Sequence, residues 1–195
     1  MGLHRAGFEV VGYDIEPQPN YPFEFHQQDA LTVDLSSFDA VWASPPCQWG
    51  IWASKRWRNA GHVYADDVPA TRKHLLIFNK PYILEQPTRR ALNSPVRLCG
   101  KAFDLGVIRH RFFETSPFLL WAADAPGCRG AVSRGEAYTV AGHGGQSLSY
   151  RVSDWREAMD IDWMTRNELT QAIPPAYSEF LGEQLKAVLQ PVAHG

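Results

Sequence analysis

Short apolar segments alternate with longer amphipathic segments along the chain, and turn residues separate them. Runs rich in β-branched and aromatic residues between Pro, Gly or Asp predict strands, and apolar positions every three or four residues predict helices. The expected strands are 8–14, 23–27, 39–43, 81–85 and 111–115, and the expected helices are 69–79, 154–159, 166–172 and 177–189. This alternation predicts an α/β fold with a mostly parallel sheet.

Turn and capping residues define several boundaries of these elements. Gly7 predicts the end of a short N-terminal helix, because glycine readily adopts the left-handed conformation of a C-cap. Ser153 and Thr165 are expected to cap the N-termini of the helices that follow them. Residues 16–22 contain three prolines and are expected to form a loop, and residues 116–153 are rich in glycine and predict loops as well.

The length and composition indicate an ordinary globular protein. The 195 residues are 45% hydrophobic and 21% charged, which favours one domain over residues 1–195. No run approaches 18 apolar residues, and the N-terminus lacks the layout of a signal peptide, so we expect a cytoplasmic protein with no membrane partner. A monomer is favoured.

The cysteines and histidines do not predict a metal site. Cys47, Cys99 and Cys128 are an odd number of widely spaced cysteines, which argues against a disulfide framework and against a Cys-x-x-Cys zinc motif. The seven histidines are scattered, and none stands at metal-ligand spacing from a cysteine. We therefore expect no metal ion.

Positive charge is concentrated in the middle of the chain. The whole protein has a net charge of −2, but residues 55–111 carry twelve Lys or Arg and four acids. Such a basic segment favours contact with phosphate groups. The alternative is a solvated Arg-rich face with no ligand.

The segment from Ala43 to Trp49 has the strongest chemical character. Pro45 and Pro46 end the preceding strand, because proline lacks an N–H group and fixes φ. Cys47 is thereby expected just beyond a strand end on a stiff loop, which is where open α/β sheets place their ligands. Cysteine at such a position is a candidate nucleophile.

Carboxylates are expected at other strand ends. Asp14, Asp29 and Glu85 each follow or end a predicted strand. An acid at the end of a parallel strand commonly binds a ribose diol, and Asp29 could accept a hydrogen bond from an adenine amino group. The alternative for each acid is a loop-capping role.

The cysteine and the nearest acid suit covalent activation of an electron-poor ring. The Cys47 thiolate would add to a ring carbon while Glu85 stabilises the ring nitrogen that gains charge. Arg109 and Arg111 alternate on a predicted strand and are expected to point the same way. Their guanidinium groups could hold a ring oxygen or a phosphate.

Together these motifs resemble the DNA (cytosine-5)-methyltransferase family, most closely the small methylase-like proteins encoded by actinobacterial phages. Residues 45–48 (PPCQ) resemble its catalytic loop, 85–87 (EQP) its Glu-Asn-Val motif, and 107–113 (VIRHRFF) its Gln-x-Arg-x-Arg motif. Residues 11–15 (VGYDI) and 28–30 (QDA) resemble its cofactor-binding segments, and 168–175 (ELTQAIPP) its last two motifs.

The resemblance implies an enzyme with a Rossmann-like sheet covered by helices on both faces. It implies S-adenosylmethionine as the cofactor and DNA, with a flipped cytosine, as the partner. The implied catalytic residues are Cys47, which attacks C6, Glu85, Arg109 and Arg111. The implied cofactor-binding residues are Asp14, Ile15, Asp29, Ala30 and Pro45. For a phage protein the compartment would be the host cytoplasm.

The chain departs from the family pattern at its start and in its middle. The family's Phe-x-Gly-x-Gly loop and first strand would precede Gly2. Two interpretations stay open, a start upstream of Met1 or a fragment with a gap in its sheet, and cofactor binding by the chain as given is an open question. Residues 116–153 correspond to a reduced target-recognition region, and the Gly142–Gly145 stretch within it fits either a nucleic-acid contact or a plain turn. Residues 48–69 correspond to the mobile catalytic loop, whose tryptophans at 49, 52 and 57 either stack on bases or are buried in the domain.

Three functions stay open at this point. The first is cytosine-C5 methylation of DNA. The second is a nucleic-acid-binding protein that kept the methyltransferase fold and lost cofactor binding. The third is an enzyme that modifies free pyrimidine nucleotides, which a small recognition region favours.

Overall fold

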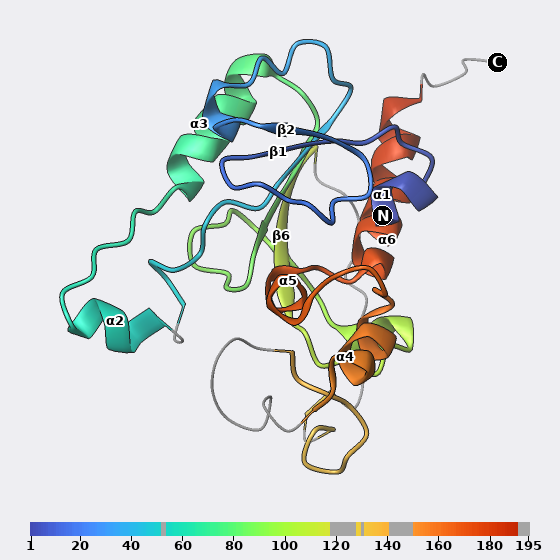
Figure 1. The fold of residues 1–195 in the computed structure, drawn as a ribbon. Coiled ribbons are helices and arrows are strands. Elements are labelled where there is room, and N and C mark those ends of the chain that lie inside the picture. The colour runs from blue at the N-terminus through green and yellow to red at the C-terminus, as the bar shows by residue number, and fades with distance from the viewer. Residues whose placement is uncertain (52–53, 118–127, 130, 141–149, 191–195) are drawn as a thin grey trace. The chain divides into compact units, whose positions relative to one another are not determined.

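The computed structural model describes residues 1–51, 54–117, 128–129, 131–140 and 150–190. Within these residues the chain forms an α/β structure, which confirms the class predicted from the sequence, and its strands lie in two sheets (Figure 1). The chain divides into two compact units made of discontinuous segments. The first unit contains residues 1–27, 98–110 and 122–195, and the second contains residues 28–97 and 111–121.

The first unit contains a parallel pair of strands, β1 (Val11–Asp14) and β2 (Glu24–Gln27). They pair in a register that sets Asp14 opposite Gln27, so both strands end at the same edge. The Gln27 side chain donates a hydrogen bond of 2.9 Å to the Ile15 carbonyl and so ties the two strand ends together. Both strands are shorter than predicted. Strand β1 begins three residues after Phe8, and β2 begins one residue after Phe23.

The same unit brings the first helix against the last one. Figure 1 shows α1 (Gly2–Arg5) beside α6 (Pro175–Leu189). A Cβ atom on Gly2 would lie 2.0 Å from the Pro175 carbonyl oxygen, so the two backbones approach as only glycine permits. As the sequence predicts, α1 ends at a left-handed glycine, Gly7, with φ of 89°.

The buried centre of the first unit lies between the C-terminal helices. Trp155 and Met159 of α4 (Val152–Met159) pack with Leu169 of α5 (Arg166–Gln171) and with Val107. The Glu168 carboxylate accepts the Thr165 N–H at 2.6 Å, which confirms the predicted cap of α5.

The predicted cap of α4 is wrong. This helix begins at Val152, so Ser153 lies inside its first turn. The Asp154 carboxylate instead accepts the Arg151 N–H at 2.9 Å, and an acid in the first turn also interacts favourably with the helix dipole.

The second sheet has the order β3–β4–β6–β5. Its strands are β3 (Val41–Ala43), β4 (Tyr82–Gln86), β5 (Val96–Leu98) and β6 (Arg111–Ser116). Strands β3 and β4 are parallel, but β4 and β6 are antiparallel, so this sheet is mixed rather than mostly parallel. Every residue of β4 is buried, as its apolar run predicts.

Helix α3 (Val68–Phe78) follows the prediction to within one residue, with Pro69 in its first turn and left-handed Asn79 at its end. The resemblance implies one sheet with its first strand missing. In the described residues, β1 pairs with β2, and β3 pairs with β4. Strands β1 and β3 each have one neighbouring strand. A search of the described helices finds none with the length and apolar character needed to cross a bilayer.

Candidate functional site

The candidate catalytic residues of the second unit meet at one edge of the β3–β4–β6 sheet. Parallel β3 and β4 end together there, since Ala43 lies opposite Leu84, and Glu85 is the next residue of β4. Cys47 follows the end of β3 by four residues. Because β6 is antiparallel to β4, it begins at this edge, with Arg111. Cys47 and Glu85 therefore lie at the ends of parallel strands, as expected from the sequence.

Glu85 and Arg111 form an ion pair at this edge. The Arg111 Nε atom lies 3.0 Å from Glu85 Oε1, and the two side chains are 15% and 7% exposed. Solvent and salt screen such a shielded pair less than a surface pair. The pair fixes where the carboxyl group and the guanidinium fork lie relative to each other.

The loop that carries Cys47 is attached to the neighbouring strand. The Gln86 side chain donates a hydrogen bond of 2.7 Å from Nε2 to the Pro45 carbonyl. The Gly50 N–H donates to the Cys47 carbonyl at 3.1 Å and closes a turn around the cysteine. Gln86 is buried and Cys47 is half-buried, so a packed side chain holds the loop.

Arg109 lies in a different environment from Arg111. Its guanidinium donates to three backbone carbonyls, those of Ala172 (2.7 Å), Val140 (2.7 Å) and Thr170 (2.8 Å). The residue is 3% exposed, and its own carbonyl accepts the Tyr177 hydroxyl at 2.6 Å.

The sequence predicts Arg109 and Arg111 on one strand, but β6 begins only at Arg111, and the two guanidinium groups bind different partners. Within the first unit, Arg109 joins the segment that resembles Gln-x-Arg-x-Arg to the segment that resembles the last two family motifs.

Two of the expected cofactor-binding residues stand at the carboxyl end of β1. The Asp14 carboxylate accepts the Glu16 N–H at 2.9 Å and the Gln18 amide at 3.3 Å, which is the loop-capping arrangement. Its neighbour Ile15 is 62% exposed. A half-buried carboxylate beside an exposed apolar side chain suits a ligand with hydroxyl groups and a flat ring.

The other expected cofactor-binding residues belong to the second unit. Asp29 is exposed and caps a 3₁₀ helix, Ala30–Thr32, by accepting the Leu31 N–H at 2.9 Å. Ala30 is exposed as well, and Pro45 is the residue held by Gln86. Asp29 thus caps the loop, and its exposed carboxylate can accept a further hydrogen bond from a ligand.

The segment after Cys47 contains a short helix that the sequence pattern did not predict. Figure 1 shows α2 (Lys55–Asn59) at the end of a long extension of the chain. The Arg58 guanidinium donates to the carbonyls of Gln48 (2.7 Å) and Ile51 (3.0 Å), so one basic side chain holds the start of the segment.

The aromatic side chains of this segment differ in exposure. Trp57 is 52% exposed, and the Arg56 guanidinium carbon lies 5.8 Å from its ring centroid. Trp49 is half-buried, and Trp52 lies outside the described residues. Trp57 is therefore not buried in the domain, and its exposed aromatic ring lies next to a positive charge.

Most of the reduced target-recognition region, including Gly142–Gly145, also lies outside the described residues. Arg129 is exposed, and Arg134 pairs with the Glu136 carboxylate at 2.5 and 2.7 Å. Arg134 is therefore paired with a neighbouring acid, whereas the Arg129 side chain is exposed.

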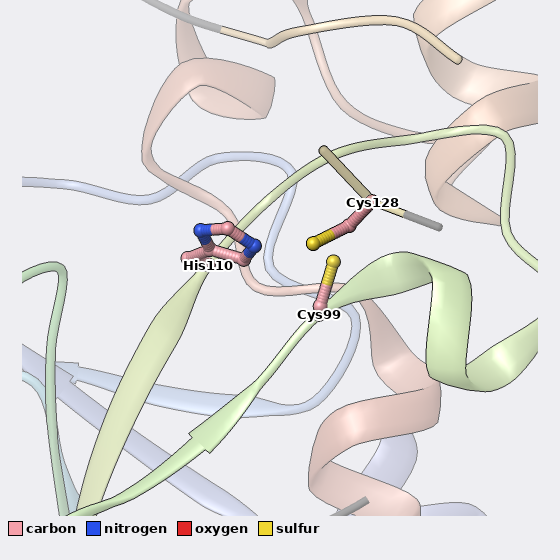
Figure 2. A group of neighbouring side chains, drawn as sticks. All are labelled: Cys99, His110 and Cys128. Carbon is pink, nitrogen blue, oxygen red and sulfur yellow. The ribbon is translucent and has the colours of Figure 1, made fainter. Parts of the chain in front are cut away.

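A thiol–imidazole cluster in the first unit was missed by the sequence analysis. One sulfur each from Cys99 and Cys128 and one ring nitrogen of His110 all lie within 4.8 Å of one another (Figure 2). Cys99 follows β5 directly, and His110 precedes β6 directly. The three residues are eleven and eighteen positions apart, so no short metal motif could reveal them.

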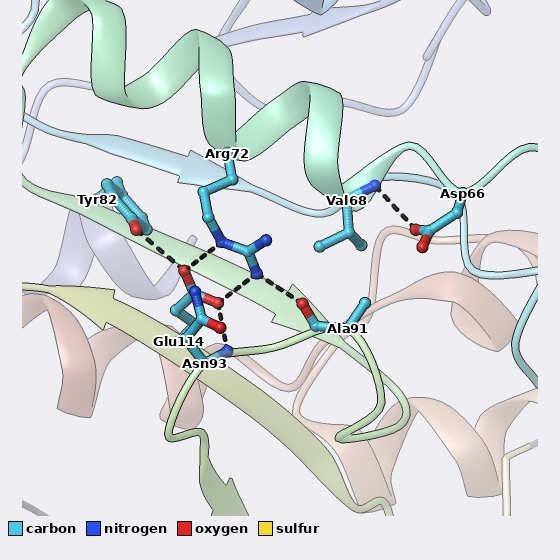
Figure 3. Close-up of polar contacts among 7 residues, drawn as sticks. All are labelled: Asp66, Val68, Arg72, Tyr82, Ala91, Asn93 and Glu114. Atoms are coloured by element: carbon cyan, nitrogen blue, oxygen red, sulfur yellow. Dashed lines mark hydrogen bonds and ion pairs between the residues drawn. The ribbon is translucent and has the colours of Figure 1, made fainter.

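A second missed feature is a buried acid network in the second unit (Figure 3). Arg72 donates to both Glu114 oxygens at 2.7 and 2.6 Å, and the Tyr82 hydroxyl and the Asn93 N–H donate to the same carboxylate at 3.0 and 2.6 Å. Arg72 also donates to the Ala91 carbonyl at 2.6 Å. The network therefore fixes the loop that follows Glu85 and Gln86.

The network shifts the pKa values of its members. Burial alone would raise the pKa of Glu114, but the hydrogen bonds from Arg72, Asn93 and Tyr82 outweigh it and hold that pKa below its ordinary value. Burial, together with the adjacent carboxylate, raises the pKa of Tyr82 to about 12. Glu114 is therefore ionised and Tyr82 protonated at neutral pH.

The basic segment divides into structural and exposed side chains. Arg58, Arg72, Arg109 and Arg111 are held by carbonyl or carboxylate oxygens. The exposed basic residues of the second unit are Lys55, Arg56, Lys73, Arg89, Arg90 and Arg97. Several basic side chains of this unit are thus exposed for contact with phosphate groups, although fewer than the twelve Lys and Arg of residues 55–111.

Comparisons of the chain with protein-family models, with curated protein sequences and with solved structures give no match. The function must therefore be argued from the residues and their geometry.

Proposed function

We propose that this protein is a cytosine-C5 methyltransferase that acts on DNA. The observation that carries the proposal is the Glu85–Arg111 pair at the sheet edge where the Cys47 loop emerges. A nucleophile, a carboxyl group and a guanidinium fork from three strand ends match the needs of addition to a pyrimidine ring. The ordered set of motifs in the sequence supports the same reaction.

In this proposal, Cys47 and Glu85 carry the covalent step. The target base leaves the duplex and enters the crevice at the strand ends. The Cys47 thiolate adds to C6, and the displaced electron density moves toward N3 and C5, where Glu85 stabilises the charge at N3. After C5 has gained a methyl group, it loses its proton to solvent, and the C6–sulfur bond breaks to restore the aromatic ring and the thiolate.

Arg111 has a positioning and binding role in this scheme. Its Nε atom lies 3.0 Å from Glu85 Oε1, and its Nη groups belong to the same planar fork. The fork suits the O2 oxygen of cytosine, so Arg111 would orient the carboxyl group and the ring together. Arg109 would act indirectly, since its guanidinium is bound to backbone carbonyls.

S-adenosylmethionine, when bound, would supply the methyl group. In the first unit, the Asp14 carboxylate suits a ribose diol and Ile15 offers an exposed apolar face. In the second unit, the exposed Asp29 carboxylate can accept a hydrogen bond from an amino group such as that of adenine. Ala30 and Pro45 are the other cofactor contacts that the resemblance implies.

Trapping with 5-fluorocytosine DNA tests the proposal. Fluorine at C5 cannot leave as a proton, so the wild-type protein with S-adenosylmethionine is expected to form a denaturation-resistant adduct. Cys47→Ser is expected to form none, while Arg97→Lys, at an exposed residue, keeps the nucleophile and serves as the control. Absence of any adduct and of any methyl transfer to DNA or to dCMP contradicts catalysis, and transfer to dCMP alone identifies a nucleotide-modifying enzyme.

One observation favours a second candidate, DNA binding without methylation. Exposed Trp57, Arg56 and Lys55 form an aromatic and basic surface that needs no cofactor. This candidate predicts salt-dependent DNA binding together with no calorimetric signal for S-adenosylmethionine. Cofactor binding at micromolar concentration rules it out.

A further inference from the structure

We propose that Cys99, His110 and Cys128 form a zinc site in the first unit. Their two sulfurs and one ring nitrogen lie within 4.8 Å of one another, and Figure 2 shows the side chains converging from three segments. In a tetrahedral site with Zn–S bonds of 2.3 Å, the ligand atoms lie roughly 3.8 Å apart. An inward movement of about 1 Å at most therefore suffices to bind the ion.

The donor types select zinc among the common metals. Two thiolates and one imidazole are soft and borderline ligands, which suit Zn²⁺ and disfavour Mg²⁺ and Ca²⁺. Binding is balanced by proton release: Zn²⁺ and two thiols give a Zn(thiolate)₂ unit and two protons, with neutral His110 as the third ligand. The resulting site is electrically neutral. The described residues provide three protein ligands, and we expect a water molecule as the fourth.

Cys99 is buried, and His110 and Cys128 are half-buried. A metal ion at the cluster would therefore be partly shielded from solvent.

Two of the three ligands are held in place by the fold itself. A Cβ atom on Gly100 would lie 2.2 Å from the Val107 carbonyl oxygen, so the backbone after Cys99 lies directly against the segment that leads to His110. The Leu105 N–H donates to the Gly100 carbonyl at 3.1 Å within this loop. Cys99 and His110 thus form a preformed half-site.

Cys128 comes from a separate segment of the same unit. This residue is half-buried, and the Ala131 N–H donates to its carbonyl at 3.4 Å. A metal ion would therefore fix the 128–140 segment to the preformed half-site. Val140, whose carbonyl accepts from Arg109, lies at the far end of that segment.

Metal analysis of the reduced full-length protein tests this proposal. We expect one zinc ion per chain in wild type and in Cys47→Ser, which changes the cysteine outside the cluster. After replacement of zinc by Co²⁺, we expect the d–d bands of tetrahedral cobalt and a sulfur-to-cobalt charge-transfer band. Cys128→Ser should weaken metal binding by more than about 100-fold, since loss of even a partner of a ligand costs 10–100-fold.

A ligand-preserving variant separates loss of the metal from loss of the fold. Cys128→His keeps a zinc ligand, so it should still bind Co²⁺ with about half of the charge-transfer intensity. Hydrogen exchange should show that metal removal exposes residues 128–140 more than residues 99–110. The proposal is overturned if reduced wild type binds neither ion, if Cys128→Ser binds as wild type does, or if intact mass reveals a Cys99–Cys128 disulfide. None of these measurements uses methyl transfer, so the zinc site stands or fails separately from the proposed activity.

Discussion

The Nε atom of Arg111 lies 3.0 Å from Glu85 Oε1, on adjacent antiparallel strands and at the edge from which the Cys47 loop emerges. The two residues are separated by 26 positions in the chain, and only the β4–β6 pairing joins them. A carboxyl group held in this way keeps one orientation toward a bound ring. This relationship leads to the first prediction.

Arg111→Lys is expected to slow adduct formation with 5-fluorocytosine DNA about 100-fold, which is the usual cost of removing one positioned charged donor. Lysine keeps the charge but loses the planar fork that binds Glu85 and a ring oxygen together. The measurement is the single-turnover rate, with exposed Arg97→Lys as the matched control. An Arg111→Lys rate equal to that of the control contradicts the assigned role.

Gln86→Met removes the donor that binds the Pro45 carbonyl while keeping the length of the side chain. We expect a loss of about 1 kcal/mol in the free energy of unfolding, the typical net value of a hydrogen bond. The adduct rate should fall about tenfold or more, because small misplacement of a reacting group is costly. Urea unfolding and single-turnover kinetics measure the two effects. Gln190→Met, on an exposed glutamine, should change neither.

Arg109→Met is expected to destabilise the first unit by about 3 kcal/mol or more, since it leaves one buried and two part-buried carbonyl acceptors without their donor. Chemical denaturation followed by tryptophan fluorescence reports the change, because Trp155 lies in the same core. Arg97→Met removes an exposed arginine and should stay within about 0.5 kcal/mol of wild type. Equal stability of the two variants refutes the structural role of Arg109.

The Glu114 network is expected to make the protein sensitive to acid. The pKa of Glu114 is held below its ordinary value of 4.5, so its contribution to stability is fully present above pH 4.5. That contribution is lost as the pH falls from 4.5 through the lower folded-state pKa. Glu114→Gln should therefore be less stable at pH 7 and lose less stability on acidification. Thermal unfolding at several pH values measures this, and parallel curves for wild type and variant exclude it.

Trp57→Ala is expected to weaken DNA binding about tenfold, because stacking of a base on an aromatic side chain contributes about 1–3 kcal/mol. The side chain is 52% exposed, so the free energy of unfolding should change little. Val63→Ala, at a residue of the same segment that is 95% exposed, is the control. Fluorescence anisotropy at two salt concentrations measures the affinity, and unchanged affinity removes Trp57 from the interface.

Local patterns predicted most of the secondary structure. Strand β4 and helix α3 were placed to within one residue, because an apolar run between prolines and a proline-led amphipathic segment are strong signals. Strand β5 was missed, since three residues contain no readable alternation. Helix α2 was missed because its Lys-Arg-Trp-Arg-Asn sequence has no apolar face, and side-chain contacts of Arg58 hold the adjacent loop instead.

The candidate site was predictable only where strand ends define it. Cys47 follows β3 and Glu85 lies near the end of β4, and because these strands are parallel, their shared edge could be inferred from the sequence. The roles of Arg109 and Arg111 could not be separated, because the start of β6 decides which partners each one meets. The cluster of Cys99, His110 and Cys128 depends on tertiary contacts between distant segments, which leave no periodic signal in the chain.

The packing of α1 on α6 has a consequence for the order of folding during synthesis. Gly2 meets Pro175 and Ser178, so the first helix has no docking site until nearly the whole chain has left the ribosome. The second unit needs only residues 28–121 and can form earlier. The second unit is therefore expected to gain its contacts before the packing of α1 on α6 completes the first unit.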